Sequence, residues 1–147
     1  MTPAASDRPL PQEVHEAAFV RAFVILAKQG RLLELLPNRK GRESILRTLY
    51  HFRDLDLRFA RQITPSEQSP EGIETLLLKL GAPHECYLVS DNRNLDARTM
   101  PLRSALEEIV GTGGGTLLSC IPGQLGYFEG EAKGDRWLLQ RKKGDRG

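Results

Sequence analysis

TLLSCIPGQLGYFEGEAKGDRWLLQ, residues 116–140, is the stretch on which the fold class rests. Runs of strand-forming residues alternate in it with two short turns. Pro122-Gly123 is the pair expected at the centre of a type II turn, in which glycine supplies the positive φ. Lys133-Gly134-Asp135 marks the second turn. Because short turns join strands that run antiparallel, the stretch predicts a three-stranded meander. The expected strands span 116–121, 125–129 and 137–140.

Two helices and one more strand are predicted immediately upstream. The helix at 70–80 has the clearest boundaries, because Ser69 is a good N-cap and Gly81 is a good C-terminal stop. Residues 86–90 are strand-like, and residues 101–110 place their apolar side chains at helical spacing. The second helix leaves enough chain for residues 86–90 to join the same sheet as the meander.

The N-terminal half is predicted to be helical. Residues 14–26 have apolar side chains at helical spacing, yet many of these are strong strand formers, so a helix is favoured and a strand stays open. Gly30 is expected to end this helix, and amphipathic helices are expected at 31–36 and 41–52. Helices followed by strands predict an α+β fold. In it, a helical N-terminal half packs on a C-terminal, mostly antiparallel sheet of order β-α-β-β-β.

The chain is expected to form one domain. A chain of 147 residues buries roughly 68–70% of its unfolded surface on folding, so it needs neither metal nor disulfide to be stable. We assign residues 11–140 to a single α+β domain. The polar, proline-bearing residues 1–10 are predicted to be a disordered N-terminus, and residues 141–147 a basic flexible tail.

The net charge of +2 is far too balanced to indicate a nucleic-acid-binding protein by itself, but it conceals a pattern. Residues 1–64 carry +4, residues 65–130 carry −5, and residues 131–147 carry +3. An acidic centre between basic ends indicates electrostatic pairing, either with a partner or with another copy of the chain.

Cysteine usage and hydropathy predict a soluble, cytoplasmic protein. Cys86 and Cys120 are too few for a disulfide framework, and two reduced, buried thiols are favoured over one bridge. Whether they are buried, paired or reactive stays open. The N-terminus lacks the basic-then-apolar order of a signal peptide. The longest apolar run, Ala22–Ala27, is far shorter than the ~20 residues of a membrane span.

No metal or cofactor is expected. The glycine run at 111–115 follows a helix and precedes a strand, which is the reverse of a phosphate-binding loop, so a helix stop and a loop are favoured. Tetrahedral zinc sites use closely spaced pairs of ligands, and only His84 and Cys86 are close in the sequence. We therefore interpret His84 as a loop residue and Cys86 as a core thiol.

A small enzyme is one alternative, although the sequence favours a protein that is not an enzyme. The weak candidates for a catalytic site are Cys120, His84 and Asp91, placed beside the 111–115 loop. They require contact in space to form a nucleophile and its base. The flanks of Cys120 resemble a strand interior, which does not lower the pKa of a thiol.

Nucleic-acid binding is the second alternative. A basic helical segment at 39–61 has its densest charge at the start, and such residues on successive helices can neutralise phosphates. Acidic residues interrupt the segment, so a solvated helical face is favoured over a nucleic-acid site. The residues assigned to this alternative are Arg39, Lys40, Arg42 and Arg47.

The favoured interpretation is a binding or regulatory module that recognises a macromolecular partner through the sheet face and adjoining loops. Tyr127 and Phe128 are neighbours on one expected strand, so they point to opposite faces of the sheet. An outward aromatic side chain near Asp91 would make a recognition surface. A protein partner or self-association is expected, and membrane binding is not; the oligomeric state and the partner's identity stay open.

Overall fold

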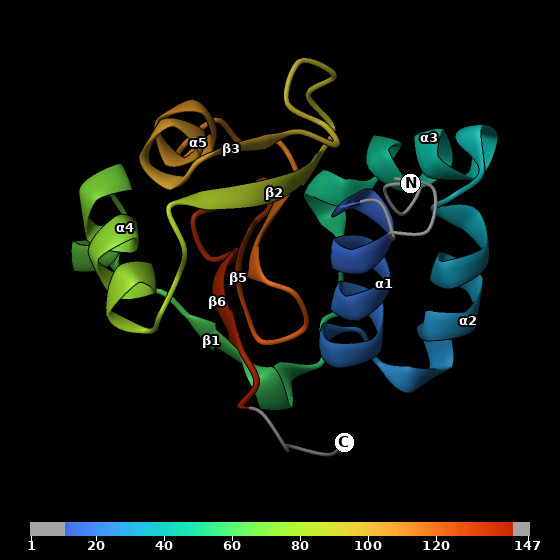
Figure 1. Ribbon diagram of the computed structural model, residues 1–147, viewed down its shortest axis with the longest axis horizontal. Coiled ribbons are helices and arrows are strands. Elements are labelled where there is room, and N and C mark those ends of the chain that lie inside the picture. Colours follow the sequence, from blue (N-terminus) through green and yellow to red (C-terminus); the bar gives the residue numbers. More distant parts are fainter. Residues whose placement is uncertain (1–10, 143–147) are drawn as a thin grey trace, which may run out of the picture.

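The computed structural model describes residues 11–142, which form a six-stranded antiparallel sheet between two layers of helices (Figure 1). The strand order is β1-β6-β5-β4-β2-β3, and every neighbouring pair is antiparallel. The predicted α+β class is therefore confirmed. The strands are β1 (Ala60–Gln62), β2 (Glu85–Ser90), β3 (Thr99–Pro101), β4 (Thr116–Ile121), β5 (Leu125–Glu129) and β6 (Arg136–Gln140).

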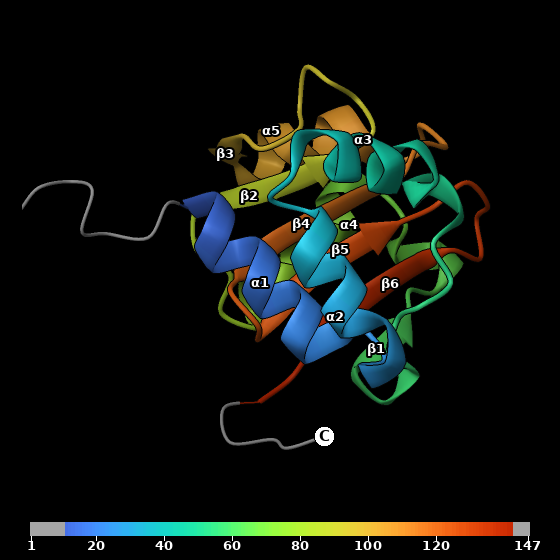
Figure 2. The ribbon, with the colours of Figure 1, turned by 90° about the vertical axis from the view of Figure 1, so that its right-hand side faces the viewer.

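The helices lie on opposite faces of this sheet: the first three on one side and the last two on the other (Figures 1 and 2). Short 3-10 turns connect α3 to β1 and β1 to α4. The α-helices are α1 (Pro11–Phe23), α2 (Leu26–Leu35), α3 (Arg39–Arg47), α4 (Pro70–Lys79) and α5 (Leu102–Ile109). The 3-10 turns are Leu49–His51, Leu57–Phe59 and Pro65–Glu67.

The predicted meander is confirmed. β4 pairs with β5 and β5 with β6 in antiparallel register. Gly123 has a φ of +71°, as the predicted turn requires. The edge strands β1 and β3 were not predicted, because each has only three residues and too little sequence for an alternating pattern.

The N-terminal half is helical, but its helices end at other places than predicted. α1 stops at Phe23, and the next residue, Val24, forms an isolated bridge with Leu55. α2 then begins at Leu26 and includes Gly30, so the prediction that Gly30 ends a helix is wrong. The break is tertiary in origin, because the Ile25 amide donates to the Asp54 carbonyl over 2.9 Å.

Each face of the sheet has its own hydrophobic core. α4 and α5 cover the core that contains Tyr127, and the first three helices cover the core that contains Phe128. The two neighbours on β5 do point to opposite faces, as predicted. Their side chains are 0% and 1% exposed, however, because helices cover both faces. The predicted outward aromatic is therefore wrong, and neither side chain reaches a partner at the surface.

Of the two predicted terminal segments, the structure describes only the first residues of the C-terminal one. Residues 1–10 and 143–147 lie outside the described residues. At the start of the predicted tail, the Arg141 amide donates to the Gln124 carbonyl over 2.8 Å. The Arg141 guanidinium also lies 4.3 Å from the centre of the Phe59 ring, so the ordered structure extends to this residue.

Candidate functional site

The N-terminus of α3 sets the position of the basic residues that the sequence assigns to nucleic acid. Asn38 is the N-cap, and its side-chain oxygen accepts the Gly41 amide over 3.1 Å. Gly41 packs so closely on α2 that an added Cβ would lie 2.5 Å from the Leu35 carbonyl oxygen. This contact fixes the rotation of α3 and directs Arg42 into the protein.

Arg42 lies between two acidic side chains from distant parts of the sequence. Its Nη1 donates to Oε1 of Glu16 over 2.6 Å. Its Nε and Nη2 donate to the two oxygens of Asp96 over 2.9 and 2.8 Å, which is the bidentate geometry of the strongest ion pairs. Burial opposes the charged guanidinium, but these bonds to Asp96 and Glu16 outweigh it and raise the pKa of Arg42.

Three further side chains complete the network around Glu16. The Tyr87 hydroxyl donates to Oε2 of Glu16 over 2.7 Å, and burial together with this carboxylate raises the pKa of Tyr87 above its ordinary value. The His15 ring stacks on Tyr87 with centroids 5.0 Å apart, and its Nδ1 lies 2.7 Å from Oγ of Ser119. Burial lowers the pKa of His15, which keeps the ring neutral at pH 7.

The segment between β2 and β3, residues 91–98, is held against α3 by the same network. Oδ1 of Asp96 accepts the Ser90 amide over 3.0 Å while its carboxylate binds Arg42. Ala97 has a φ of +60°, a left-handed conformation that costs energy for a residue other than glycine. The network thus joins α1, α3 and this segment into one unit.

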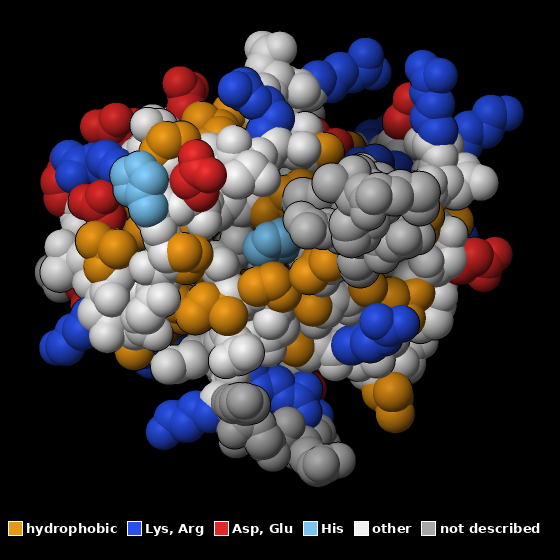
Figure 3. All heavy atoms as spheres, viewed as in Figure 1, with side chains coloured by type: hydrophobic (Ala, Val, Ile, Leu, Met, Phe, Trp, Pro, Cys, Tyr) orange, Lys and Arg blue, Asp and Glu red, His pale blue; other side chains and the backbone are white. Residues whose placement is uncertain are grey.

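Five exposed cations lie on α3 and the 91–98 segment, and we call them the basic ridge: Arg39, Lys40, Arg47, Arg93 and Arg98. Figure 3 shows Lys and Arg side chains projecting from the upper edge of the molecule, over α3 and the 91–98 segment. Arg47 and Arg93 come from these two elements and line one hollow of about 230 Å³. Leu46, Glu43 and Asp91 are the other residues of this hollow.

The basic segment predicted at 39–61 is not one surface. Arg39, Lys40 and Arg47 are exposed as expected, but the Arg42 side chain is only 12% exposed and its guanidinium is bonded to Glu16 and Asp96. These ion pairs occupy the donors that a phosphate would need, so they argue against Arg42 in a nucleic-acid site. Further along, the positive charges of Arg53, Arg58 and Arg61 are paired with Asp135, Asp56 and Glu67.

Asp91 bonds the end of β2 to the glycine run at 111–115. It is exposed at the end of β2, and its Oδ2 accepts the Gly115 amide over 2.9 Å. Gly115 in turn lies so close to the 3-10 turn after α3 that an added Cβ would be 2.2 Å from the Tyr50 nitrogen. The glycine run therefore permits a close approach of backbone segments.

The candidates for an enzyme site do not converge. His84 immediately precedes β2 and Asp91 immediately follows it, which separates them by roughly 20 Å of extended chain. Cys120 is buried in the core beneath α4 and α5, beside Cys86 on the neighbouring strand. A hydrogen bond with Cys86 and burial raise the pKa of Cys120, so its thiolate is disfavoured.

Among residues 11–142, no cluster of three or more His, Cys, Asp or Glu side chains is arranged to hold a metal ion. Within the same residues, none of the helices combines the length and the hydropathy needed to cross a membrane.

Sequence reasoning missed the acidic members of the network. Glu16 is only 5% exposed, whereas the apolar Val14 two residues earlier is 39% exposed. The segment around α1 is apolar on nearly every side, so its pattern contains no signal for a buried carboxylate. Asp96 lies in a polar segment, and its partner Arg42 is 54 residues away in the sequence, so no local pattern identifies it as a buried ion-pair partner.

The chain was compared with protein-family models, with curated proteins and with solved structures, and none of them matches it.

Proposed function

We propose that this protein is a binding module that recognises an acidic surface of a protein partner through the basic ridge. The observation that supports the proposal is the hollow between Arg47 and Arg93. These two cations come from elements far apart in the sequence, and the Arg42 network holds those elements together. Elements that are already held in position lose less loop freedom when a partner binds.

The composition of the hollow favours a protein over a nucleic acid. Glu43 and Asp91 lie among its cations, and carboxylates would repel a continuous track of phosphates. A protein partner can place carboxylates opposite Arg47 and Arg93 and hydrogen-bond donors opposite the two acids. Leu46 adds an apolar contact at the same place. Nucleic-acid binding is the competing proposal.

The proposed location is the cytoplasm, in keeping with the two free thiols, because reducing compartments preserve them. The partner can also be a second copy of the chain. The acidic side chains of α4 and α5 around Arg103, which are Glu71, Glu74 and Glu107, lie on the opposite layer of the molecule from α3 and offer a complementary charge.

The test is a binding measurement with labelled probes of equal length: a glutamate-rich peptide, a lysine-rich peptide and a single-stranded oligonucleotide. We expect fluorescence anisotropy to detect the glutamate-rich peptide, with an affinity that falls as salt is raised. Sedimentation of the protein alone measures self-association in the same buffers.

The two proposals predict different orders of affinity. Tighter binding of the oligonucleotide than of the glutamate-rich peptide at about physiological salt would establish the nucleic-acid alternative. Equal binding of the glutamate-rich and lysine-rich peptides would remove the electrostatic basis of both proposals.

A further inference from the structure

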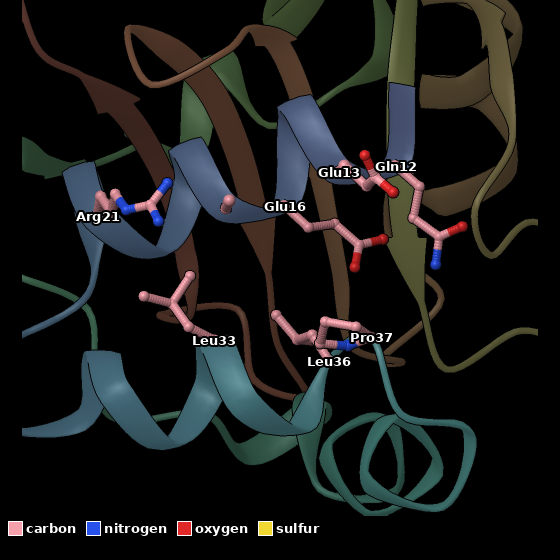
Figure 4. A pocket seen from close by; sticks show the side chains of 8 residues that line it. Gln12, Glu13, Glu16, Arg21, Leu33, Leu36 and Pro37 are labelled. Carbon is pink, nitrogen blue, oxygen red and sulfur yellow. The ribbon is translucent and has the colours of Figure 1, made fainter. Parts of the chain in front are cut away.

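A cavity of about 520 Å³ lies between α1 and α2, and Glu16 of the Arg42 network is one of its lining residues. Its volume is within the roughly 300–1,000 Å³ typical of small-molecule sites. α1 contributes the polar wall, and the C-terminal end of α2 with Pro37 contributes the apolar wall (Figure 4). The lining residues are Gln12, Glu13, Glu16, Ala17, Arg21, Leu33, Leu36 and Pro37.

The charges of the cavity are separated along its length. Figure 4 shows the carboxylates of Glu13 and Glu16 at one end and the Arg21 guanidinium at the other. Leu33 and Leu36 line the opposite wall between these ends. The apolar wall between the two ends fits a ligand with an apolar body, and the end that contains the buried Glu16 fits a charged group.

The sign of that charge follows from the buried network. Glu16 and Asp96 share a single guanidinium, that of Arg42, so within residues 11–142 these three groups carry a net charge of −1. Each oxygen of Glu16 accepts one hydrogen bond there, and a carboxylate oxygen has room for a second. A negative charge withdrawn from water and facing a cavity favours a cation.

We propose that the cavity binds a small organic cation: a primary ammonium group between Glu13 and Glu16, with an apolar body along Leu33 and Leu36. Arg21 at the far end repels a second positive charge, so a monoamine fits and a diamine does not. This site is independent of the proposed partner surface, because none of its lining residues belongs to the basic ridge.

The test uses three probes of nearly equal shape: phenylbutylamine, phenylbutanol and phenylbutyrate. Each is titrated into the full chain, with binding measured by calorimetry and located by amide shifts in ¹⁵N–¹H spectra. We expect the ammonium probe to bind tightest, the alcohol more weakly and the carboxylate weakest, with shifts concentrated on Ala17, Leu33 and Leu36. Hexanediamine is expected to bind more weakly than hexylamine.

Two variants and one control test the position of the site. Glu13→Gln is expected to weaken the ammonium probe up to roughly fivefold, because it removes one partly exposed charge. Ala17→Leu is expected to abolish binding by filling the cavity. Glu34→Gln removes an exposed charge of α2 that is not in the lining, and it should leave binding unchanged.

The proposal is overturned if the alcohol binds as tightly as the amine, or if no probe binds at millimolar concentration. It is also overturned if Glu34→Gln weakens binding as much as Glu13→Gln. Because Glu13 is exposed, Glu13→Gln is expected to fold even if Ala17→Leu does not. The binding measurement on Glu13→Gln therefore tests the proposal without the Ala17 variant.

Discussion

Arg42 was predicted to lie on the surface, but it holds distant parts of the chain together through its ion pairs. Its neighbours in sequence, Arg39 and Lys40, are exposed, and nothing local distinguishes it from them. Its environment is set by Glu16 and Asp96, which lie 26 and 54 residues away in the sequence. A pair at such a separation is invisible to patterns of helical or strand spacing, so the sequence could predict the charge but not its burial.

Removing the Arg42 charge should destabilise the protein strongly. Arg42→Met keeps the apolar stem but leaves two carboxylates without a cation, and breaking a buried pair typically costs about 3–5 kcal/mol. We expect this loss in the free energy of unfolding, measured with urea at neutral pH. Arg39→Met is the matched control, because the Arg39 side chain is 94% exposed. A loss below about 1 kcal/mol in Arg42→Met would contradict the role of the network.

His15 should make stability depend on pH in the mildly acidic range. Burial holds its pKa below the ordinary value of 6.5, so the unfolded chain takes up a proton at a higher pH than the folded protein. The stability that comes from the neutral ring is present above pH 6.5 and is lost as the pH falls below it.

The matched variant is His15→Gln, which can still hydrogen-bond with Ser119 but does not titrate. We expect wild-type protein to lose more unfolding free energy than His15→Gln between about pH 7 and about pH 5. His84→Gln, at an exposed position, should behave as wild type does. The same pH dependence in His15→Gln and wild type would show that another group is responsible.

At the level of elements, local signals predicted α4 well and α2 badly. Ser69 caps α4 through a 3.0 Å bond from the Gly72 amide, and these two residues are only three positions apart in the sequence. The end of α1 depends instead on contacts with residues 54–56, so no cap or glycine marks it. β1 and β3 are edge strands whose pairing depends on β6 and β2. Elements with their own start and stop residues are therefore predictable, and elements fixed by distant partners are not.

The junction of α2 and α3 provides a matched pair of glycine substitutions. An added Cβ at Gly41 would lie 2.5 Å from the Leu35 carbonyl oxygen, whereas at Gly30 it meets nothing within 4 Å. We expect Gly41→Ala to destabilise the protein by about 1–3 kcal/mol through overpacking. Gly30→Ala should stabilise it by about 0.4–1 kcal/mol, because alanine reduces the freedom of the unfolded chain and favours a helix.

Urea unfolding of the two variants measures the difference directly. If Gly41→Ala were as stable as Gly30→Ala, the close contact of α3 with α2 would not determine which way Arg42 points.

At the level of the whole molecule, the two helical layers leave neither face of the sheet free for a partner. The sequence predicted a sheet with helices packed on it, and the aromatic residues of β5 were expected to mark one free face. α4 and α5 cover one face, and the first three helices cover the other, so Tyr127 and Phe128 are both core residues. The proposed function therefore assigns recognition to the edges and loops, where α3 meets the 91–98 segment.

The charge blocks along the sequence are rearranged by the same folding. Arg93 and Arg98 belong to the acidic block at 65–130, but in space they join Arg39, Lys40 and Arg47 from the basic N-terminal block. The sequence thus predicted three of the five ridge residues. The other two could not be assigned without knowing that Arg42 binds Asp96.

The most direct test of the proposed function is the affinity for a labelled glutamate-rich peptide after charge reversal on the ridge. In Arg47→Glu/Arg93→Glu we expect the dissociation constant at low salt to rise by at least about tenfold. Lys28→Glu/Arg31→Glu, with the same change of charge at exposed positions of α2, should keep an affinity within about twofold of wild type. An equal loss in both double variants, or no loss in the ridge variant, would contradict the proposal.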